Sequence, residues 1–270
     1  MTDVRQLKPL RYRSIFISDT HLGFRGARAD FLLDFLESVE CETLYLVGDI
    51  IDIWEMHRRG LKWPDSHNAV IQNVLKRARN GTRVIYIPGN HDEMMRDYAG
   101  MSIEGVSIEL RAIHECADGR RLLVLHGDEF DTVVQCSRLV AILGNRMYAW
   151  LIRANHWLNR VRQAFNQPYW SLAAYLKQRT KNAMRYIANY EEALVHEARE
   201  AGVDGLVCGH IHHAELTERS DVLYCNDGDW VESCTALVES HQGGLELIAW
   251  AEMRETLKSA PASSADARAA

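Results

Sequence analysis

Side chains that bind metal ions or transfer protons follow several short apolar runs of this chain. One such run, Leu44–Val47, ends at Gly48 and is followed by Asp49 and Asp52. A run of this length fits a buried strand and is too short for a helix. In open α/β sheets, ligands bind beyond the carboxyl ends of the strands. The two carboxylates are therefore predicted to lie where a ligand binds.

The same arrangement recurs at four other places, so five strand-like runs end in oxygen or imidazole donors. Such donors suit manganese, iron or zinc. Seven protein ligands are too many for one ion with an open catalytic position. They fit two ions about 3.5–4 Å apart that share a carboxylate, as in two-metal phosphoester hydrolases. The seven candidate metal ligands are Asp19, His21, Asp49, Asn90, His126, His210 and His212.

The order Asp-x-His, Gly-Asp-x-x-Asp, Gly-Asn-His-Asp, His and Gly-His-x-His spans residues 14–212. It resembles the calcineurin-like metallophosphoesterase family. The resemblance implies an α/β fold, a β-sandwich flanked by helices, and a dinuclear-metal phosphoester or pyrophosphate hydrolase. It also implies the ligand sets: Asp19, His21, Asp49 and His212 would hold the first ion, and the second would share Asp49 and add Asn90, His126 and His210.

The same resemblance implies roles for three neighbouring residues. His91 would face the substrate and stabilise charge or protonate the leaving oxygen, with Asp92 hydrogen-bonded behind it. Asp52 would orient a ligand histidine. The two divalent ions, Mn²⁺ first and Fe²⁺ or Zn²⁺ as alternatives, would lower the pKa of a shared water so that hydroxide attacks phosphorus.

Length and composition predict one α/β domain with an insertion, since 270 residues can bury a full core. No apolar segment precedes the first predicted strand, so we expect no signal peptide or membrane span. Six cysteines without paired spacing favour reduced thiols in a cytosolic protein. The expected domains are a core over 12–132 and 200–255, a helical insertion or cap over 133–199, and a disordered tail over 256–270.

Apolar periodicity predicts the elements that position the donors. A helix is expected after Asp30, its predicted N-cap, and another over Glu191–Ala201. Strands are expected over residues 83–87, 106–110, 121–126 and 205–208. The last three strands, Val222–Cys225, Cys234–Val238 and Leu245–Ala249, are predicted to form a second sheet.

The net charge of −6 hides a strong asymmetry. Between Thr132 and Tyr190 there are nine Lys or Arg residues and no Asp or Glu. Charge segregation of this kind marks a surface for anionic partners. Apolar residues from Leu139 to Phe165 recur at helical spacing, and a flank of this predicted helix carries Arg146, Arg153 and Arg160.

This helix either packs on the core or caps the metal site, where it would hold an acyl chain and contact anionic lipid. The three insertion arginines are candidate substrate contacts. Arg25, on the loop after His21, is another.

Within the family, this plan is similar to that of the UDP-2,3-diacylglucosamine pyrophosphatases of lipid A biosynthesis. Those enzymes carry a helical insertion after the His-Gly-Asp motif. They hydrolyse a lipid-linked UDP sugar to UMP and 2,3-diacylglucosamine 1-phosphate, typically with manganese, at the inner face of the membrane. The resemblance implies such a substrate, an anionic membrane surface as partner, and a cytoplasmic, peripheral location. One residue departs: the best-known members have arginine where this chain has His91.

Other functions stay open at this point. The substrate can be a different phosphodiester, of a phospholipid or a nucleotide. A nuclease fits the basic insertion, but nucleic-acid sites interleave basic residues with exposed aromatics, whereas these aromatics lie in an apolar stripe. Nucleic acid therefore ranks below lipid as a partner. A non-catalytic metal-binding interaction module would typically have lost a ligand, and all seven donors are present.

Overall fold

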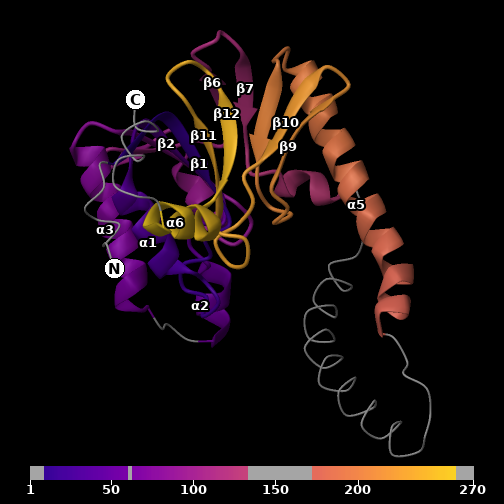
Figure 1. The fold of residues 1–270 in the computed structure, drawn as a ribbon, viewed down its shortest axis with the longest axis horizontal. Helices are drawn as coiled ribbons and strands as arrows, with labels where there is room; N and C mark the ends of the chain where they lie inside the picture. Colours follow the sequence, from indigo (N-terminus) through magenta and orange to yellow (C-terminus); the bar gives the residue numbers. More distant parts are fainter. Residues whose placement is uncertain (1–8, 60–62, 133–171, 260–270) are drawn as a thin grey trace, which may run out of the picture. The chain divides into compact units, whose positions relative to one another are not determined.

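The computed structural model describes residues 9–59, 63–132 and 172–259 of the chain (Figure 1). It divides into a larger unit, residues 1–128 and 194–270, and a smaller unit, residues 129–193. Most of the predicted insertion lies outside the described residues, and so do Arg146, Arg153 and Arg160. In the smaller unit, the described residues include the first part of one long helix, where the Tyr186 hydroxyl donates a hydrogen bond to Asp131.

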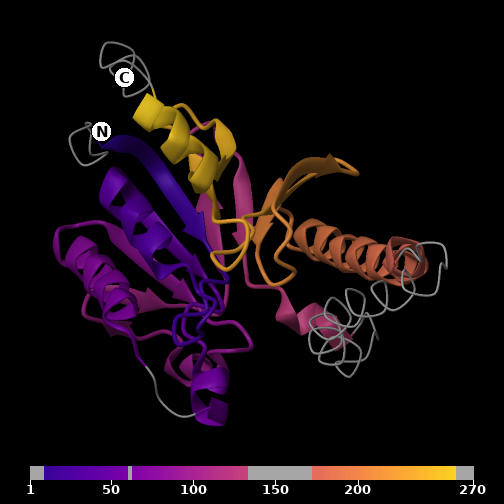
Figure 2. The same ribbon diagram turned by 60° about the horizontal axis from the view of Figure 1, so that its bottom comes forward.

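The larger unit is built on two β-sheets, which confirms the predicted α/β class (Figures 1 and 2). The first sheet has seven strands, and β1, β2, β3 and β5 run parallel within it. Its spatial order is β12 (Leu245–Ala249), β11 (Thr235–Glu239), β1 (Leu10–Ile17), β2 (Val39–Val47), β3 (Arg83–Ile87), β5 (Val106–Ile108) and β4 (Ser102–Ile103).

The second sheet has five strands, and β7, β8 and β10 run parallel within it. Its spatial order is β6 (Ala112–Glu115), β7 (Arg121–Val124), β8 (Gly205–Cys208), β10 (Val222–Asn226) and β9 (Glu215–Arg219). None of the helices in the described ranges is both long enough and apolar enough to cross a membrane. These helices are α1 (Ala29–Ser38), α2 (Ile53–Arg59), α3 (Asp65–Arg79), the 3-10 helices η2 (Glu93–Tyr98) and η3 (Asp128–Thr132), α5 (Leu172–Glu200) and α6 (Trp250–Ser259).

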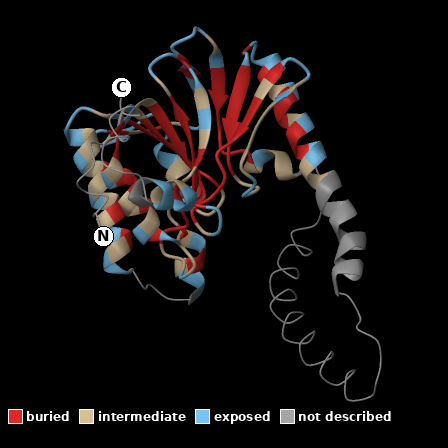
Figure 3. Cartoon of the chain, in the orientation of Figure 1, coloured by how far each residue is buried: buried red, intermediate tan, exposed pale blue. Residues whose placement is uncertain are grey.

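The central strands are apolar on both faces because each face is covered (Figure 3). Leu44 and Leu46 of β2 belong to a core cluster that also contains residues of α1 and α3. The alternating residues, Tyr45 and Val47, belong to a second cluster with residues of β7, β8 and β10. The period of two along a strand thus divides its side chains between a helix-facing core and a core between the sheets. This is why the sequence shows continuous apolar runs.

Three details differ from the sequence prediction. Of the last three strands, only β10 joins the second sheet, because β11 pairs antiparallel with β1 and β12 pairs with β11. Asp30 lies in the first turn of α1 and Arg28 takes the N-cap position. Helix α6 continues to Ser259, past the predicted start of the tail at residue 256.

A buried ionic network joins the two sheets. Glu239 of β11 is fully buried, and its carboxylate accepts hydrogen bonds from Arg13 of β1 at 2.8 Å and from His114 of β6 at 2.8 Å. The backbone N–H of Ala117 donates a third bond at 2.7 Å, and the Nδ1 atom of His114 lies 3.2 Å from the Tyr45 hydroxyl. Burial raises the pKa of Glu239, but these donors outweigh it and hold that pKa below its usual value.

We predict that Glu239→Gln lowers the free energy of unfolding by about 2 kcal/mol at pH 7, since it leaves the Arg13 guanidinium without its counter-charge. A carboxyl whose pKa is depressed by folding stabilises the protein above its unfolded pKa, and this contribution is lost as the pH falls through the folded value. The difference between variant and wild type should therefore shrink below the ordinary glutamate pKa of 4.5. Urea denaturation at several pH values measures this difference in the free energy of unfolding. The exposed Glu218→Gln is the control, and a difference that does not change with pH would contradict the account.

Candidate metal centre

The predicted donors lie just beyond the carboxyl ends of strands in both sheets. Asp19 and His21 follow β1, Asp49 follows β2, and Asn90 follows β3 in the first sheet. In the second sheet, His126 follows β7, and His210 and His212 follow β8. Because β1, β2 and β3 run parallel, as do β7 and β8, the donors of each sheet gather at one edge. Hydrogen bonds join the two groups, for example from the His210 N–H to Asp19 Oδ2 at 2.9 Å.

Five of these residues have left-handed backbone conformations, with φ between 47° and 70°. Such conformations are uncommon in residues other than glycine, although Asp and His adopt them more readily than most. Strained backbone of this kind clusters at functional sites, where the surrounding structure maintains it. Here it turns the chain sharply at the strand ends. The five residues are Asp19, His21, Asp49, His210 and His212.

Two glycines beside the donors make room for the neighbouring donor. A Cβ atom at Gly48 would lie 2.2 Å from Nδ1 of His126, and one at Gly89 would lie 2.2 Å from Oδ1 of Asp49. No side chain fits at either distance. The glycines of the Gly-Asp and Gly-Asn-His-Asp motifs are therefore required for the close approach of the loops.

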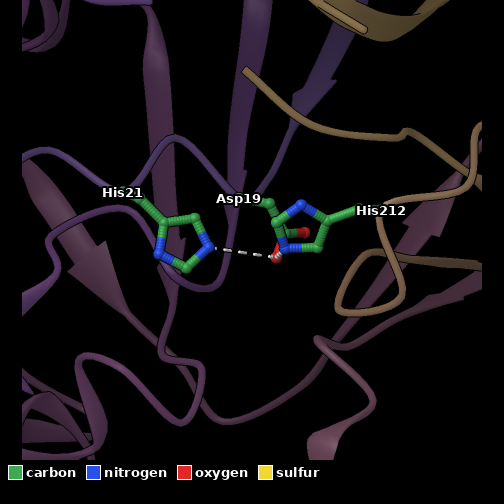
Figure 4. Close-up of side chains that lie close together, drawn as sticks. All are labelled: Asp19, His21 and His212. Atoms are coloured by element: carbon green, nitrogen blue, oxygen red, sulfur yellow. Dashed lines mark ion pairs between the residues drawn. The ribbon is translucent and has the colours of Figure 1, made fainter. Parts of the chain in front are cut away.

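Asp19, His21 and His212 form the first cluster (Figure 4). Each offers a ligand atom, and these atoms lie within 4.8 Å of one another. The Nε2 atoms of His21 and His212 lie 3.8 Å and 3.1 Å from Asp19 Oδ1. Asp19 is fully buried, whereas the His212 side chain is 38% exposed. The cluster thus combines a buried carboxylate with an accessible imidazole.

Asp49, His126 and His210 form the second cluster, again within 4.8 Å of one another. Asp49 Oδ2 lies 3.5 Å from Nε2 of His126 and 3.8 Å from Nε2 of His21, which belongs to the first cluster. Asp49 Oδ1 accepts a hydrogen bond from the His91 N–H at 2.8 Å. Asp49 therefore lies between the two clusters, as a bridging carboxylate must.

Hydrogen bonds fix the tautomers of two of the histidines. Nδ1 of His126 lies 2.8 Å from the carbonyl oxygen of Val47, which can only accept, so Nδ1 carries the proton. Nδ1 of His21 likewise donates to Asp52 at 3.1 Å. In both residues Nε2 is left to face the clusters, the usual arrangement for metal-binding histidines with an outer carbonyl or carboxylate partner.

Asp52 also holds His91, the residue expected to face the substrate. Its Oδ1 atom accepts a hydrogen bond from Nδ1 of His91 at 3.0 Å. The predicted partner of His91 was Asp92, and in this respect the sequence prediction is wrong. The described contacts of Asp92 are with the backbone N–H groups of Ile50, Ile51 and Gly89 and with the Tyr86 hydroxyl. Asp92 therefore fixes the loop that carries Asp49, and its predicted catalytic role has no geometric support.

The buried carboxylates of the site require nearby positive charge to remain ionised. Burial alone lowers the pKa of His21, but hydrogen bonds and charge from Asp19, Asp52 and Asp49 outweigh it and raise that pKa to about 10. Burial raises the pKa of Asp49, but the cationic His126 outweighs it and lowers that pKa to about 2. Protons on histidines thus balance the carboxylates, and a metal ion must displace them, so metal binding should strengthen as the pH rises.

The donor set fits two divalent ions. Within the described ranges, the buried atoms without a hydrogen-bond partner include His21 Nε2 and Asn90 Oδ1, both on predicted ligands. Buried polar atoms are rarely left without partners, so such atoms call for an ion or a water. Imidazole nitrogens and carboxylate and amide oxygens are the donors that manganese, iron and zinc accept.

The remaining predicted substrate contact among the described residues is Arg25. Arg25 is exposed on the loop between β1 and α1, and its role stays a prediction.

Sequence reasoning missed Trp54 of α2, which is half exposed and whose ring lies edge-on to His91 at 5.7 Å between centroids. Its place five residues after Asp49 in the sequence was the available signal.

Comparison with known proteins identifies the class. The model of the calcineurin-like phosphoesterase family matches residues 12–214. The chain is 25% identical to a UDP-2,3-diacylglucosamine hydrolase of Porphyromonas gingivalis, covering 82% of this chain and 92% of that protein. It is 27% identical to a protein of the same name from Cellvibrio japonicus, covering 74% and 81%. Among solved structures it is similar to an archaeal phosphodiesterase, with 15% identity, coverage of 87% and 98%, and a TM-score of 0.41.

The chain therefore belongs to the calcineurin-like phosphoesterase family and is a metal-binding hydrolase. It resembles the UDP-2,3-diacylglucosamine hydrolases among the members of that family.

Two alanine substitutions should separate metal binding from chemistry. Asp49→Ala removes the carboxylate between the clusters, so we predict loss of bound metal and a fall in activity of more than about 100-fold. His91→Ala should leave the metal content near that of the wild type and lower kcat by about 10²- to 10⁴-fold, the usual contribution of a positioned proton donor.

Elemental analysis of the purified variants and kinetics with a soluble phosphodiester measure both effects. The matched controls are the exposed Asp97→Ala and His57→Ala, which should resemble the wild type. Full metal content in Asp49→Ala would contradict its role as a metal ligand. Loss of metal in His91→Ala would show that His91 binds metal.

Proposed function

We propose that this protein is a dinuclear-metal phosphoester hydrolase whose substrate is a lipid-linked nucleotide sugar such as UDP-2,3-diacylglucosamine. The observation that carries the dinuclear assignment is the position of Asp49 between two clusters of donors. Asp19, His21 and His212 would hold one ion, Asn90, His126 and His210 the other, and Asp49 both. When bound, the ions supply Lewis-acid charge for the phosphate oxygens and a water of lowered pKa.

The residues of the chain then position the ligands and the substrate and supply a proton. Asp52 accepts one hydrogen bond from His21 and one from His91, so a single carboxylate aligns a metal ligand and the residue beside the substrate. Since Nδ1 of His91 is held by Asp52, its Nε2 atom is the one available to a substrate oxygen. The His91 side chain is 26% exposed, so a phosphate can reach it. We infer that His91 stabilises charge on the phosphate or gives a proton to the leaving oxygen.

Two observations support the lipid-linked substrate. Three relatives named UDP-2,3-diacylglucosamine hydrolase align with 74–86% of the chain, at 22–27% identity. The segment between Thr132 and Tyr190 is basic and free of acidic residues, as suits an anionic lipid surface. Hydrolysis would give UMP and 2,3-diacylglucosamine 1-phosphate. We further propose manganese as the ion and a cytoplasmic location, peripheral at the inner face of the membrane.

A second candidate is a phosphodiesterase of different specificity, acting on a phospholipid or a nucleotide. It is favoured by His91, which stands where the best-known UDP-2,3-diacylglucosamine pyrophosphatases have arginine. A histidine offers one donor atom toward the phosphate where an arginine offers a fork of several. The two candidates share the metal centre and differ in what binds beside it.

Activity on two substrates distinguishes them. We predict that manganese-loaded protein releases UMP from UDP-2,3-diacylglucosamine with a kcat/KM at least about 100-fold above that for bis(p-nitrophenyl) phosphate. Reversal of Arg146, Arg153 and Arg160 to Glu should raise KM for the lipid substrate by roughly 10- to 100-fold, because each basic residue contributes about 1 kcal/mol toward an anionic surface. Activity on the small substrate should persist.

The charge-matched control replaces Lys76, Arg83 and Arg121 with Glu. These three residues are exposed on the larger unit. Equal activity on both substrates, or equal effects of the two triple variants, would favour the second candidate.

A further inference from the structure

A cavity of about 150 Å³ reaches into the helix-facing core of the larger unit and is partly open to solvent. Strands of the first sheet line it with Ile17, Leu46 and Ile108, and α3 lines it with Val70 and Val74. All five side chains are buried. Native cores are packed about as densely as organic crystals, so a cavity of this size that extends into a core is a departure from ordinary packing.

The lining includes two side chains with hydroxyl groups, and both hydroxyls are engaged elsewhere. Thr20 donates its hydroxyl hydrogen to the Ile50 carbonyl at 2.8 Å, and the Tyr86 hydroxyl donates to Asp92. A buried water needs two to four polar partners, and the other side chains that line this cavity are hydrocarbon or thioether groups. The cavity is therefore suited to an apolar occupant and not to water.

The wall of the cavity reaches the surface beside η2 and β4. Met95 of η2 is half buried and Ile103 of β4 is 44% exposed, and both line the cavity. The same stretch of chain exposes further large apolar side chains, namely Met94, Tyr98 and Met101. An apolar molecule that arrives from solvent or from a lipid surface thus meets apolar side chains at the point of entry.

We propose that this cavity is a binding site for a small hydrocarbon, about the size of benzene or of the last few carbons of an acyl chain. An engineered, enclosed cavity of about 150 Å³ lined by Leu, Ile and Phe binds benzene or xenon, and the cavity here offers a lining of the same chemistry and volume. The site is distinct from the metal centre, but its wall includes Thr20, between Asp19 and His21, and Ile50, next to Asp49. A bound molecule would pack against the underside of the turns that carry these ligands.

Methyl NMR of the full-length protein tests the proposal with xenon and with benzene as probes. The expected result is saturable shifts of the methyl groups of Ile17, Leu46 and Val74. The core between the sheets is an internal control, and its methyl groups, such as those of Val124 and Val207, should not shift. Absence of shifts, or equal and unsaturable shifts in both cores, would overturn the proposal.

Two substitutions of opposite volume at one position sharpen the test. Val74→Phe should fill the cavity, abolish the saturable shifts and raise the melting temperature, whereas Val74→Ala should enlarge the cavity and preserve binding. Should the phenylalanine variant fail to fold, the alanine variant still decides, because loss of xenon binding in an enlarged cavity would contradict the assignment. Saturable xenon shifts that persist in a folded Val74→Phe would contradict it as well.

Competition identifies the source of the hydrocarbon. Displacement of xenon by hexanoate would assign the site to the end of an acyl chain. Displacement by benzene but not by hexanoate would assign it to compact apolar molecules.

Discussion

The structure of the site depends on two carboxylates, Asp19 and Asp49, that are buried beside each other. Each has an oxygen 3.8 Å from the same atom, Nε2 of His21. Buried like charges repel strongly in a medium of low dielectric, so the arrangement persists only with compensating positive charge. Backbone N–H groups of His210 and His91 contribute part of it, and imidazoles the rest. Divalent ions are the compensation that such a site is built to take.

The fold provides this convergence with parallel strands and sharply turning loops. The strands have both faces buried, which fixes their ends in space, and left-handed residues at those ends redirect the chain. Glycines at positions 48 and 89 leave room for the donor of the next loop. Asp92, fully buried, ties the Asp49 loop to the β3 loop through backbone N–H groups of both. The rigidity of the site is thus achieved mainly by backbone hydrogen bonds and packing.

The sequence indicated the donors because each follows an apolar run, and strand ends are where parallel sheets present ligands. It could not distinguish Asp52 from Asp92 as the partner of His91. Asp92 is adjacent in sequence, but its side chain turns toward the Asp49 loop, whereas Asp52 reaches His91 from the loop that follows β2. The sequence also did not reveal which sheet contains β11, because an apolar run does not encode its pairing partner. Trp54 was overlooked because a single aromatic residue carries no periodic signal.

The most direct test is anomalous scattering from manganese in crystals of the protein. The account predicts two peaks about 3.5–4 Å apart, one in contact with Asp19, His21 and His212 and the other with Asn90, His126 and His210. Asp49 should contact both peaks, and His91 neither. A single peak, or two peaks without Asp49 between them, would contradict the account.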